Sequence, residues 1–255
     1  MNIWSLLPLL EIWAVAFAVF LRVGSAAALL PMLGERAIPM RVRLIFALAY
    51  TSIVAPVVWA DLAGALPFGT GWLLFGGAEV VTGLTLGVAL RLLILALQVA
   101  GTIAAQAVSL SQIFGAAGVE PMPAIGHILT VGGLALAAIL GLHVQLAGYL
   151  VQSYQVIPPG VFWLSADLAH WGSNHVAHSF SLAFSLAAPF VLVSVIYNLA
   201  LGVINRAMPQ LMVSFVGAPA ITGGGLLLIT LSAPVLLAVW VRAVSEVLAN
   251  PTGLP

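Results

Sequence analysis

Four residues that lie close together in the sequence have side chains that could bind a metal ion: Asp167, His170, His175 and His178. Imidazole and carboxylate groups are common zinc ligands. Their spacing matches no established ligand motif, and Trp163 and Trp171 lie among them, which is typical of an interfacial collar with hydrated polar tips. We therefore expect a collar in the loop 157–178 and no metal cofactor.

Other catalytic patterns are also missing. The triple glycine at 223–225 could suggest a phosphate-binding loop, but no strand is expected before it and no Lys-Ser/Thr pair follows. A bent or closely packed helix explains it better. No carboxylate pair, Ser/His/Asp set or nucleophile elbow can be assembled, so we predict that the protein is not an enzyme and has no cofactor.

The composition is that of a membrane protein. Of 255 residues, 63% are hydrophobic and 5% charged, whereas about 25% of a soluble domain is charged. The net charge is zero, which leaves no basic surface for nucleic acid. Cysteine is absent, so disulfides and thiolate sites are excluded.

Six apolar segments meet or approach the roughly 20 residues that a spanning helix needs. They are 3–32, 44–59, 72–100, 127–156, 179–203 and 211–241. The first contains charged residues and has no basic region before it, so we interpret it as a retained helix and not a signal peptide. The prediction is an all-α integral membrane protein that forms one domain over 1–255.

Two of these segments contain charged residues: Glu11, Arg22, Glu79 and Arg91. Glu11 and Arg22 are separated by about 16 Å of helical rise, and Glu79 and Arg91 lie about 120° apart around their helix, so neither pair can form within its own helix. An unpaired charge at bilayer depth costs at least about 2.5 to 3.5 kcal/mol. We expect contacts with other subunits to satisfy these side chains.

Three glycines in the third segment share one helical face. Gly76, Gly83 and Gly87 follow spacings that place them together. Small residues on one face allow another helix backbone to approach closely. We predict close packing there, within this chain or between chains.

The stretch 101–123 is a poor helix and a poor membrane span. It contains several polar residues, glycines and prolines, yet it is too apolar for a solvated linker. We expect it to be buried in protein or to line a cavity; an ordinary cytoplasmic loop is the alternative.

Arginine-rich turns orient the chain. The turn 34–43 contains Glu35, Arg36, Arg41 and Arg43. By the positive-inside rule this turn, with 101–123 and 203–210, faces the cytoplasm. At 203–210 a polar tip, Asn205, Arg206, Pro209 and Gln210, joins two apolar segments. Pro209 disfavours helical geometry in the residue before it, so the chain is expected to turn here. We therefore predict a tight helical hairpin.

The residues and spacing of two motifs resemble those of a known family. One is Asn198-Leu199-Ala200-Leu201-Gly202, Asn205-Arg206, Pro209-Gln210 and Val213-x-Phe215-x-Gly217-x-Pro219; the other is Pro31-x-Leu33-Gly34-Glu35-Arg36-x-Ile38-Pro39-x-Arg41-Val42-Arg43. Together they resemble the flagellar biosynthetic FliR family and its injectisome counterparts. The resemblance runs from about Phe20 to about Leu237.

The resemblance implies a subunit of the flagellar type III export gate in the bacterial inner membrane, at the flagellar basal body and partly raised toward the periplasm. It implies a FliP-like part, 1–178, and a FliQ-like hairpin, 179–255, in a helical assembly. The implied partners are FliP-like, FliQ-like, FlhB-like and FlhA-like subunits, rod or adaptor proteins, and secreted unfolded proteins.

The resemblance also implies a loop that plugs the channel. The corresponding residues are Gln106, Ser111, Gln112, Ile113, Phe114, Glu120 and Met122. Here Gly115-Ala116 departs from the family pattern, which leaves the contacts of the plug open. We further expect the tip 205–210 to contact the FlhB-like subunit at the cytoplasmic entrance.

Three alternatives differ in class. An injectisome subunit would share the motifs, although the Gly34-Glu35-Arg36-x-x-Pro39 wording favours the flagellum. A small-molecule transporter would carry broken helices at matching places in two halves, and Pro56 and Pro219 do not match in that way. A passive scaffold would have no pore.

Overall fold

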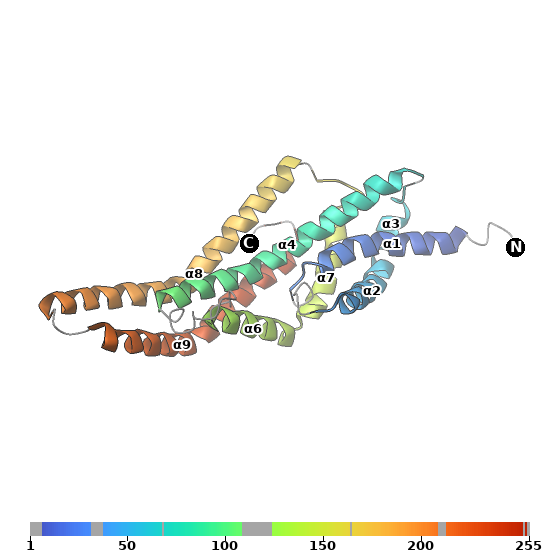
Figure 1. Ribbon diagram of the computed structural model, residues 1–255. Coiled ribbons are helices and arrows are strands. Elements are labelled where there is room, and N and C mark those ends of the chain that lie inside the picture. The colour runs from blue at the N-terminus through green and yellow to red at the C-terminus, as the bar shows by residue number, and fades with distance from the viewer. Residues whose placement is uncertain are drawn as a thin grey trace. The chain divides into compact units, whose positions relative to one another are not determined.

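The computed structural model describes residues 7–31, 38–67, 69–108, 124–163, 165–208, 213–251 and 253. Every regular element in these ranges is an α-helix (Figure 1). In chain order they are α1 (Leu7–Ala27), α2 (Met40–Val57), α3 (Trp59–Ala63), α4 (Gly71–Ala107), α6 (Ala124–Ile139), α7 (Leu142–Val156), α8 (Ser165–Ala207) and α9 (Val213–Ala249).

Five helices are long and apolar enough to cross a membrane: α1, α2, α4, α8 and α9. Helices α6 and α7 together pass the same test but meet at a bend of 76°, so they form either a broken span or a re-entrant pair. The predicted all-α membrane protein with about six apolar helices is therefore confirmed.

The break between α6 and α7 corrects the sequence-based expectation of one helix over 127–156. Gly141 has a φ of 78°, a left-handed conformation that glycine adopts without steric cost. The α6 helix ends at Ile139 and α7 begins at Leu142. Other glycines in the segment remain helical, so the sequence alone does not mark this one.

The start of the stretch 101–123 is also helical, against expectation. Helix α4 continues through Gly101 to Ala107. A Cβ atom at Gly101 would lie 2.1 Å from Cα of Gly126 on α6, so this glycine permits a backbone contact and does not end the helix. Residues 109–123 lie outside the described part of the chain.

One compact unit contains α1, α2, α3, α4 up to Leu92, the chain from Ala137 through α7 to His175, and the chain from Ala243. Hydroxyl groups join its helices. The Tyr149 hydroxyl donates to the Leu86 carbonyl at 3.2 Å, and the Tyr50 hydroxyl donates to the His143 carbonyl at 3.0 Å. In this way α7 is linked to both α4 and α2.

The second compact unit contains the chain from Leu93 to Leu136 and from Val176 to Arg242. Trp240 of α9 is fully buried here, and its Nε1 donates to the Leu93 carbonyl at 2.8 Å. A Cβ atom at Gly133 of α6 would lie 3.3 Å from the Trp240 ring and 2.7 Å from Cδ1 of Leu97. The tryptophan thus packs among α4, α6 and α9.

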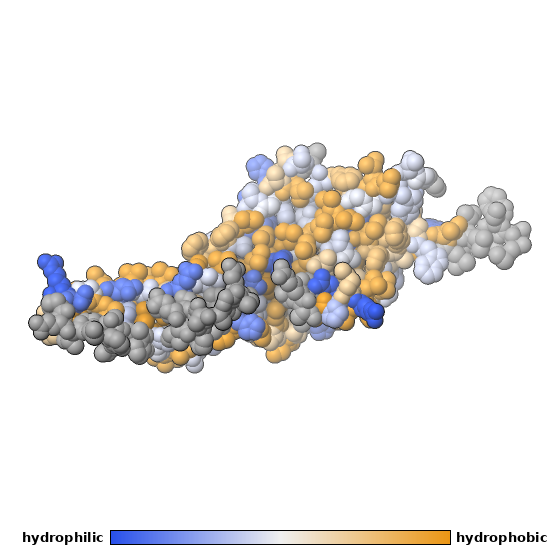
Figure 2. Space-filling view, in the orientation of Figure 1, coloured by the Kyte–Doolittle hydropathy of each residue, from blue (hydrophilic) through white to orange (hydrophobic). Residues whose placement is uncertain are grey.

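In the described part of the chain, helices α8 and α9 have much of their apolar surface exposed. Ile196 and Leu199 on α8 are 68% and 69% exposed, and Leu231 on α9 is 68% exposed. Hydrophobic residues also cover much of the face drawn in Figure 2. In an aqueous protein such surfaces would be unfavourable, so lipid or other protein must cover them.

Candidate functional site

A buried ion pair lies inside the first unit. Arg22 of α1 and Glu79 of α4 are both fully buried, and two parallel hydrogen bonds join them. Arg22 Nε donates to Glu79 Oε2 at 2.7 Å, and Nη2 donates to Oε1 at 3.0 Å. This two-point geometry is the strongest form of arginine–carboxylate contact.

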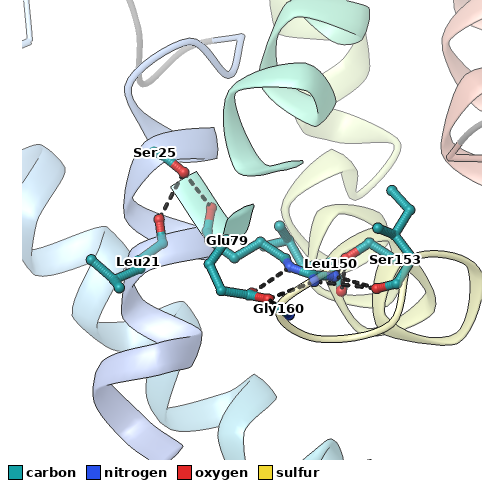
Figure 3. A network of polar contacts seen from close by, with 8 residues as sticks. Leu21, Ser25, Glu79, Leu150, Ser153 and Gly160 are labelled. Carbon is teal, nitrogen blue, oxygen red and sulfur yellow. Dashed lines mark hydrogen bonds and ion pairs between the residues drawn. The ribbon is translucent and has the colours of Figure 1, made fainter. Parts of the chain in front are cut away.

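Three further groups complete the surroundings of this pair. Arg22 Nη1 donates to Ser153 Oγ at 3.2 Å, and both Nη atoms donate to the Ile157 carbonyl at 3.2 Å. The backbone N–H of Gly160 donates to Glu79 Oε1 at 2.9 Å. Figure 3 shows how Glu79, Ser153 and Gly160 converge. The network therefore joins α1, α4, α7 and the turn that follows α7.

An aromatic ring and two glycines shape the space around the arginine. Arg22 Cζ lies 3.7 Å from the centroid of the Tyr154 ring, within cation–π range. A Cβ atom at Gly83 would lie 2.1 Å from the Arg22 carbonyl, and one at Gly87 would lie 2.8 Å from the Ala26 carbonyl. The predicted close packing of the glycine face is confirmed, with α1 of the same chain as its neighbour.

This geometry corrects the expectation that other subunits satisfy Arg22 and Glu79. Fifty-seven positions separate the two residues in sequence, so helical spacing could not identify the pair. The available signal was that the first and third apolar segments each contain one basic and one acidic residue. Glu11 is exposed on α1 and Arg91 is half-buried on α4; their subunit contacts stay predictions.

The predicted cytoplasmic turn is described only in part. Arg41 is exposed and Arg43 half-buried at the start of α2. Glu35 and Arg36 lie outside the described residues. The structure therefore places two of the four predicted residues on the first turn of one helix.

The hairpin motif joins α8 to α9, as predicted. Helix α8 continues through Asn205 and Arg206, both exposed, and ends directly after them at Ala207. Helix α9 begins at Val213. Pro209 and Gln210 lie outside the described residues.

A hydrogen bond joins the two arms of this hairpin. The Tyr197 hydroxyl donates to the Gly217 carbonyl. A Cβ atom at Gly217 would lie 2.6 Å from the Tyr197 oxygen and 3.3 Å from Leu201 Cδ1. Gly217 belongs to the motif that carried the family resemblance, and close approach of α8 explains why a glycine stands there.

The proposed plug residues fall almost entirely outside the described chain. Gln106 is exposed near the end of α4. Ser111, Gln112, Ile113, Phe114, Glu120 and Met122 lie in 109–123, which the structure does not describe. The plug thus stays a prediction.

The histidine- and tryptophan-rich stretch differs from the hydrated collar that was expected. Helix α8 begins at Ser165, so His170, Trp171 and His175 are helical. His175 is 4% exposed, its ring stacks on Trp171 with centroids 4.2 Å apart, and its Nδ1 lies 3.1 Å from the Trp171 carbonyl. Among the described residues, no group of three His, Asp or Glu side chains could hold a metal ion.

The sequence matches the family described as bacterial export proteins, family 1, over residues 13–247. It is 36% identical to the flagellar biosynthetic protein FliR of Caulobacter vibrioides over 239 residues, which cover 92% of this chain and 94% of that protein. It is 29% identical to the FliR protein of Escherichia coli over 208 residues, covering 80% of this chain and 78% of that protein.

A third relative, the FliR protein of Aquifex aeolicus, is 29% identical over 222 residues, covering 85% of this chain and 84% of that protein. The family match spans both sequence motifs and the residues of the buried ion pair. The chain therefore belongs to the bacterial export proteins, family 1, and is a membrane protein of that family.

Proposed function

We propose that this chain is a subunit of the flagellar type III export gate in the bacterial inner membrane. Its role there is structural and concerned with transport, with no catalysis. It forms, with FliP-like and FliQ-like subunits, the channel through which unfolded flagellar proteins are secreted. Family membership and the flagellar relatives support the flagellar assignment over the injectisome.

The uncovered apolar surface of α8 is the observation that carries the proposal. Exposed apolar side chains occur from Val176, 41% exposed, to Ile204, 45% exposed. The rise counted along the helix between them is about 42 Å. A bilayer core covers about 30 Å. The remaining apolar surface needs protein partners.

The exposed apolar surface of α8 also supports a division of the chain into two parts. Residues 179–255 form a FliQ-like hairpin whose outer face packs on neighbouring subunits, and residues 1–178 form the FliP-like part. The charges of Arg22 and Glu79 are paired with each other inside the first unit, so they do not have to be satisfied by a partner. An assembly raised partly toward the periplasm accommodates helices longer than the bilayer.

Other partners follow from the proposed position. The exposed tip at Asn205 and Arg206 contacts the FlhB-like subunit at the cytoplasmic entrance. The stretch from Gln106 to Met122 plugs the channel at rest, with Ile113 and Phe114 as its apolar seal. FlhA-like subunits and rod or adaptor proteins lie farther along the export path.

Co-purification tests the assignment. The chain is expressed with the FliP-like and FliQ-like proteins of the same bacterium and isolated in mild detergent through a tag on this chain. A complex of fixed stoichiometry is expected. Leu199→Gln, on the exposed face of α8, should lower the yield of the complex, whereas Leu199→Met should preserve it because it keeps an apolar side chain of similar volume.

Folding of the variants is checked separately by the thermal stability of the chain expressed alone. A wild-type chain that remains a stable, lipid-embedded monomer when its candidate partners are present would overturn the proposal. So would a Leu199→Gln variant that folds normally and assembles as well as Leu199→Met.

A further inference from the structure

The segment between α7 and α8 is attached to the buried ion pair. We call residues 157–163 the strap, and all of them belong to the first unit. The Ile157 carbonyl accepts hydrogen bonds from both Nη atoms of Arg22 at 3.2 Å, and the Gly160 N–H donates to Glu79 Oε1 at 2.9 Å. Figure 3 shows Gly160 beside Glu79. Each residue of the pair therefore holds one backbone group of the strap.

Two prolines make these two contacts depend on each other. Pro158 and Pro159 lie between Ile157 and Gly160, and a proline has a fixed φ and no N–H to donate. Ile157 has an extended backbone, with φ −121° and ψ 97°, as expected for a residue before proline. Because a stiff link of two residues joins the two contacts, the strap should be held or released as one piece.

Two phenylalanine rings lie between the strap and α4. A Cβ atom at Gly160 would lie 2.4 Å from Cδ2 of Phe75, and Gly160 has a φ of 71°, so glycine is needed there. Cζ of Phe162 lies 3.2 Å from the Cβ position of Gly77. Phe162 and Val161 are nevertheless 48% and 49% exposed. Since so much of the strap remains exposed, its apolar contacts alone give it little hold on α4.

Two tryptophans connect the strap to the first turns of α8. The rings of Trp163, in the strap, and Trp171, in α8, have centroids 6.1 Å apart and meet edge to face. Trp171 is 8% exposed and also contacts the His175 ring at 4.2 Å. Helix α8 up to His175 belongs to the same unit as the strap. A displacement of the strap would therefore carry these turns with it.

The energetics of buried ion pairs favour a role in positioning over a role in stability. Replacement of such a pair by apolar residues of similar volume is often neutral or stabilising. Here the replacement would also leave the Ile157 carbonyl and the Gly160 N–H without their partners, which is costly for buried backbone groups. Both groups could regain hydrogen bonds from water if the strap lifted. Loss of the pair should therefore open the strap and spare the rest of the unit.

We propose that Arg22 and Glu79 are positioning residues that lock the strap, and through Trp163 the first turns of α8, onto α4. When the lock is broken, the strap and residues 165–175 open together while α1, α4 and α7 stay folded. The lock requires no partner chain, so it stands apart from the proposed role in the export gate.

Hydrogen exchange of backbone amides tests the lock. The full chain with both Arg22→Met and Glu79→Met is purified in detergent and compared with the wild-type chain by mass spectrometry. Its unfolding temperature should stay close to the wild-type value, because apolar side chains of similar volume replace the pair. Exchange at Gly160 should be at least about tenfold faster, as expected when a hydrogen bond to a charged group is lost. Residues 169–175 should follow, whereas α7 and the part of α4 before Leu92 should keep their wild-type rates.

Two control variants separate the steps of the proposal. Trp163→Ala should speed exchange in residues 169–175 and leave Gly160 protected, because it removes the ring contact with Trp171 and keeps the bonds to the ion pair. Thr51→Val, on α2, removes a buried hydroxyl that donates to the Ala47 carbonyl of its own helix at 2.7 Å. It should change the exchange of neither region.

Wild-type protection of Gly160 in the folded double variant would overturn the proposal. Faster exchange spread evenly over α1, α4 and α7 would do the same, because the pair would then only stabilise the unit. If the double variant does not fold, Arg22→Lys provides the test, since lysine keeps the charge but lacks the planar fork that reaches Glu79 and Ile157 together. Faster exchange at Gly160 is expected in this variant, and an unchanged rate there would refute the lock.

Discussion

Arg22 and Glu79 form a fully buried, two-point ion pair that joins α1 to α4, with Nε and Oε2 2.7 Å apart. The pair has hydrogen-bond partners on both sides, in Ser153, the Ile157 carbonyl and the Gly160 N–H. Such pairs contribute little net stability compared with apolar packing, but removal of one partner is costly. This asymmetry gives a direct test.

Glu79→Gln should destabilise the protein by about 3–5 kcal/mol, because the Arg22 guanidinium would be left buried without a counter-charge. The double variant Arg22→Met, Glu79→Gln should recover a large part of this loss. Thermal unfolding in detergent, followed by size-exclusion chromatography, measures both. Equal losses in the single and double variants would show that the charge pairing is unimportant for stability.

Gly83→Ala should destabilise the contact between α1 and α4 by about 1–3 kcal/mol through overpacking. The added Cβ would lie 2.0 Å from Ser25 Oγ and 2.1 Å from the Arg22 carbonyl. Gly148→Ala, on α7, is the matched control, since no heavy atom lies within 4 Å of its Cβ position. The same thermal assay should find the control neutral or slightly stabilised; equal effects at the two sites would contradict the close contact.

Tyr197→Phe should cost about 0.5–1.5 kcal/mol because it removes the hydrogen bond to the Gly217 carbonyl. Gly217→Ala should cost more, since its Cβ would lie 2.6 Å from the tyrosine oxygen. In the Tyr197→Phe background the alanine should be better tolerated, because the clashing oxygen is gone.

Hydrogen exchange of the backbone amides in α8 and α9 reports on this contact. Gly202→Ala is the control, with no heavy atom within 4 Å of its Cβ position. Strictly additive effects of Tyr197→Phe and Gly217→Ala would argue against direct contact between the two residues.

Arg206→Glu should impair assembly or secretion if the tip of the hairpin contacts the entrance subunit. The side chain is exposed in the last turn of α8, where a positive charge interacts favourably with the helix dipole. Secretion of flagellar proteins into the medium and the yield of the purified complex are the measurements. Arg206→Lys, which keeps the charge, should behave nearly as wild type. Normal secretion by both variants would contradict the proposed contact between the tip and the entrance subunit.

Deletion of 109–118 should raise leakage of ions or small solutes through the assembled gate, because the proposed plug would lose its apolar seal. Conductance of the reconstituted complex is the measurement. A Gly/Ser linker of the same length controls for chain connectivity and should leak as well. Unchanged conductance in a fully assembled complex would exclude the plug role.

The apolar helices were predictable because hydropathy is a local property of the sequence. The all-α class, the hairpin between α8 and α9 and the close packing at Gly83 and Gly87 all follow from composition and helical spacing. The break at Gly141 was not predictable, because one glycine among several adopts a left-handed conformation to suit its surroundings.

The sequence by itself also determined that Arg22 and Glu79 need partners, since charge within an apolar segment is unfavourable. Only the tertiary structure decided that they are partners of each other. Their pairing depends on how closely α1 approaches α4 at Gly83, and on a turn after α7 that brings Ile157 and Gly160 to the same place. These distances are set by how different helices pack, so they cannot be predicted from the periodicity of residues along one helix.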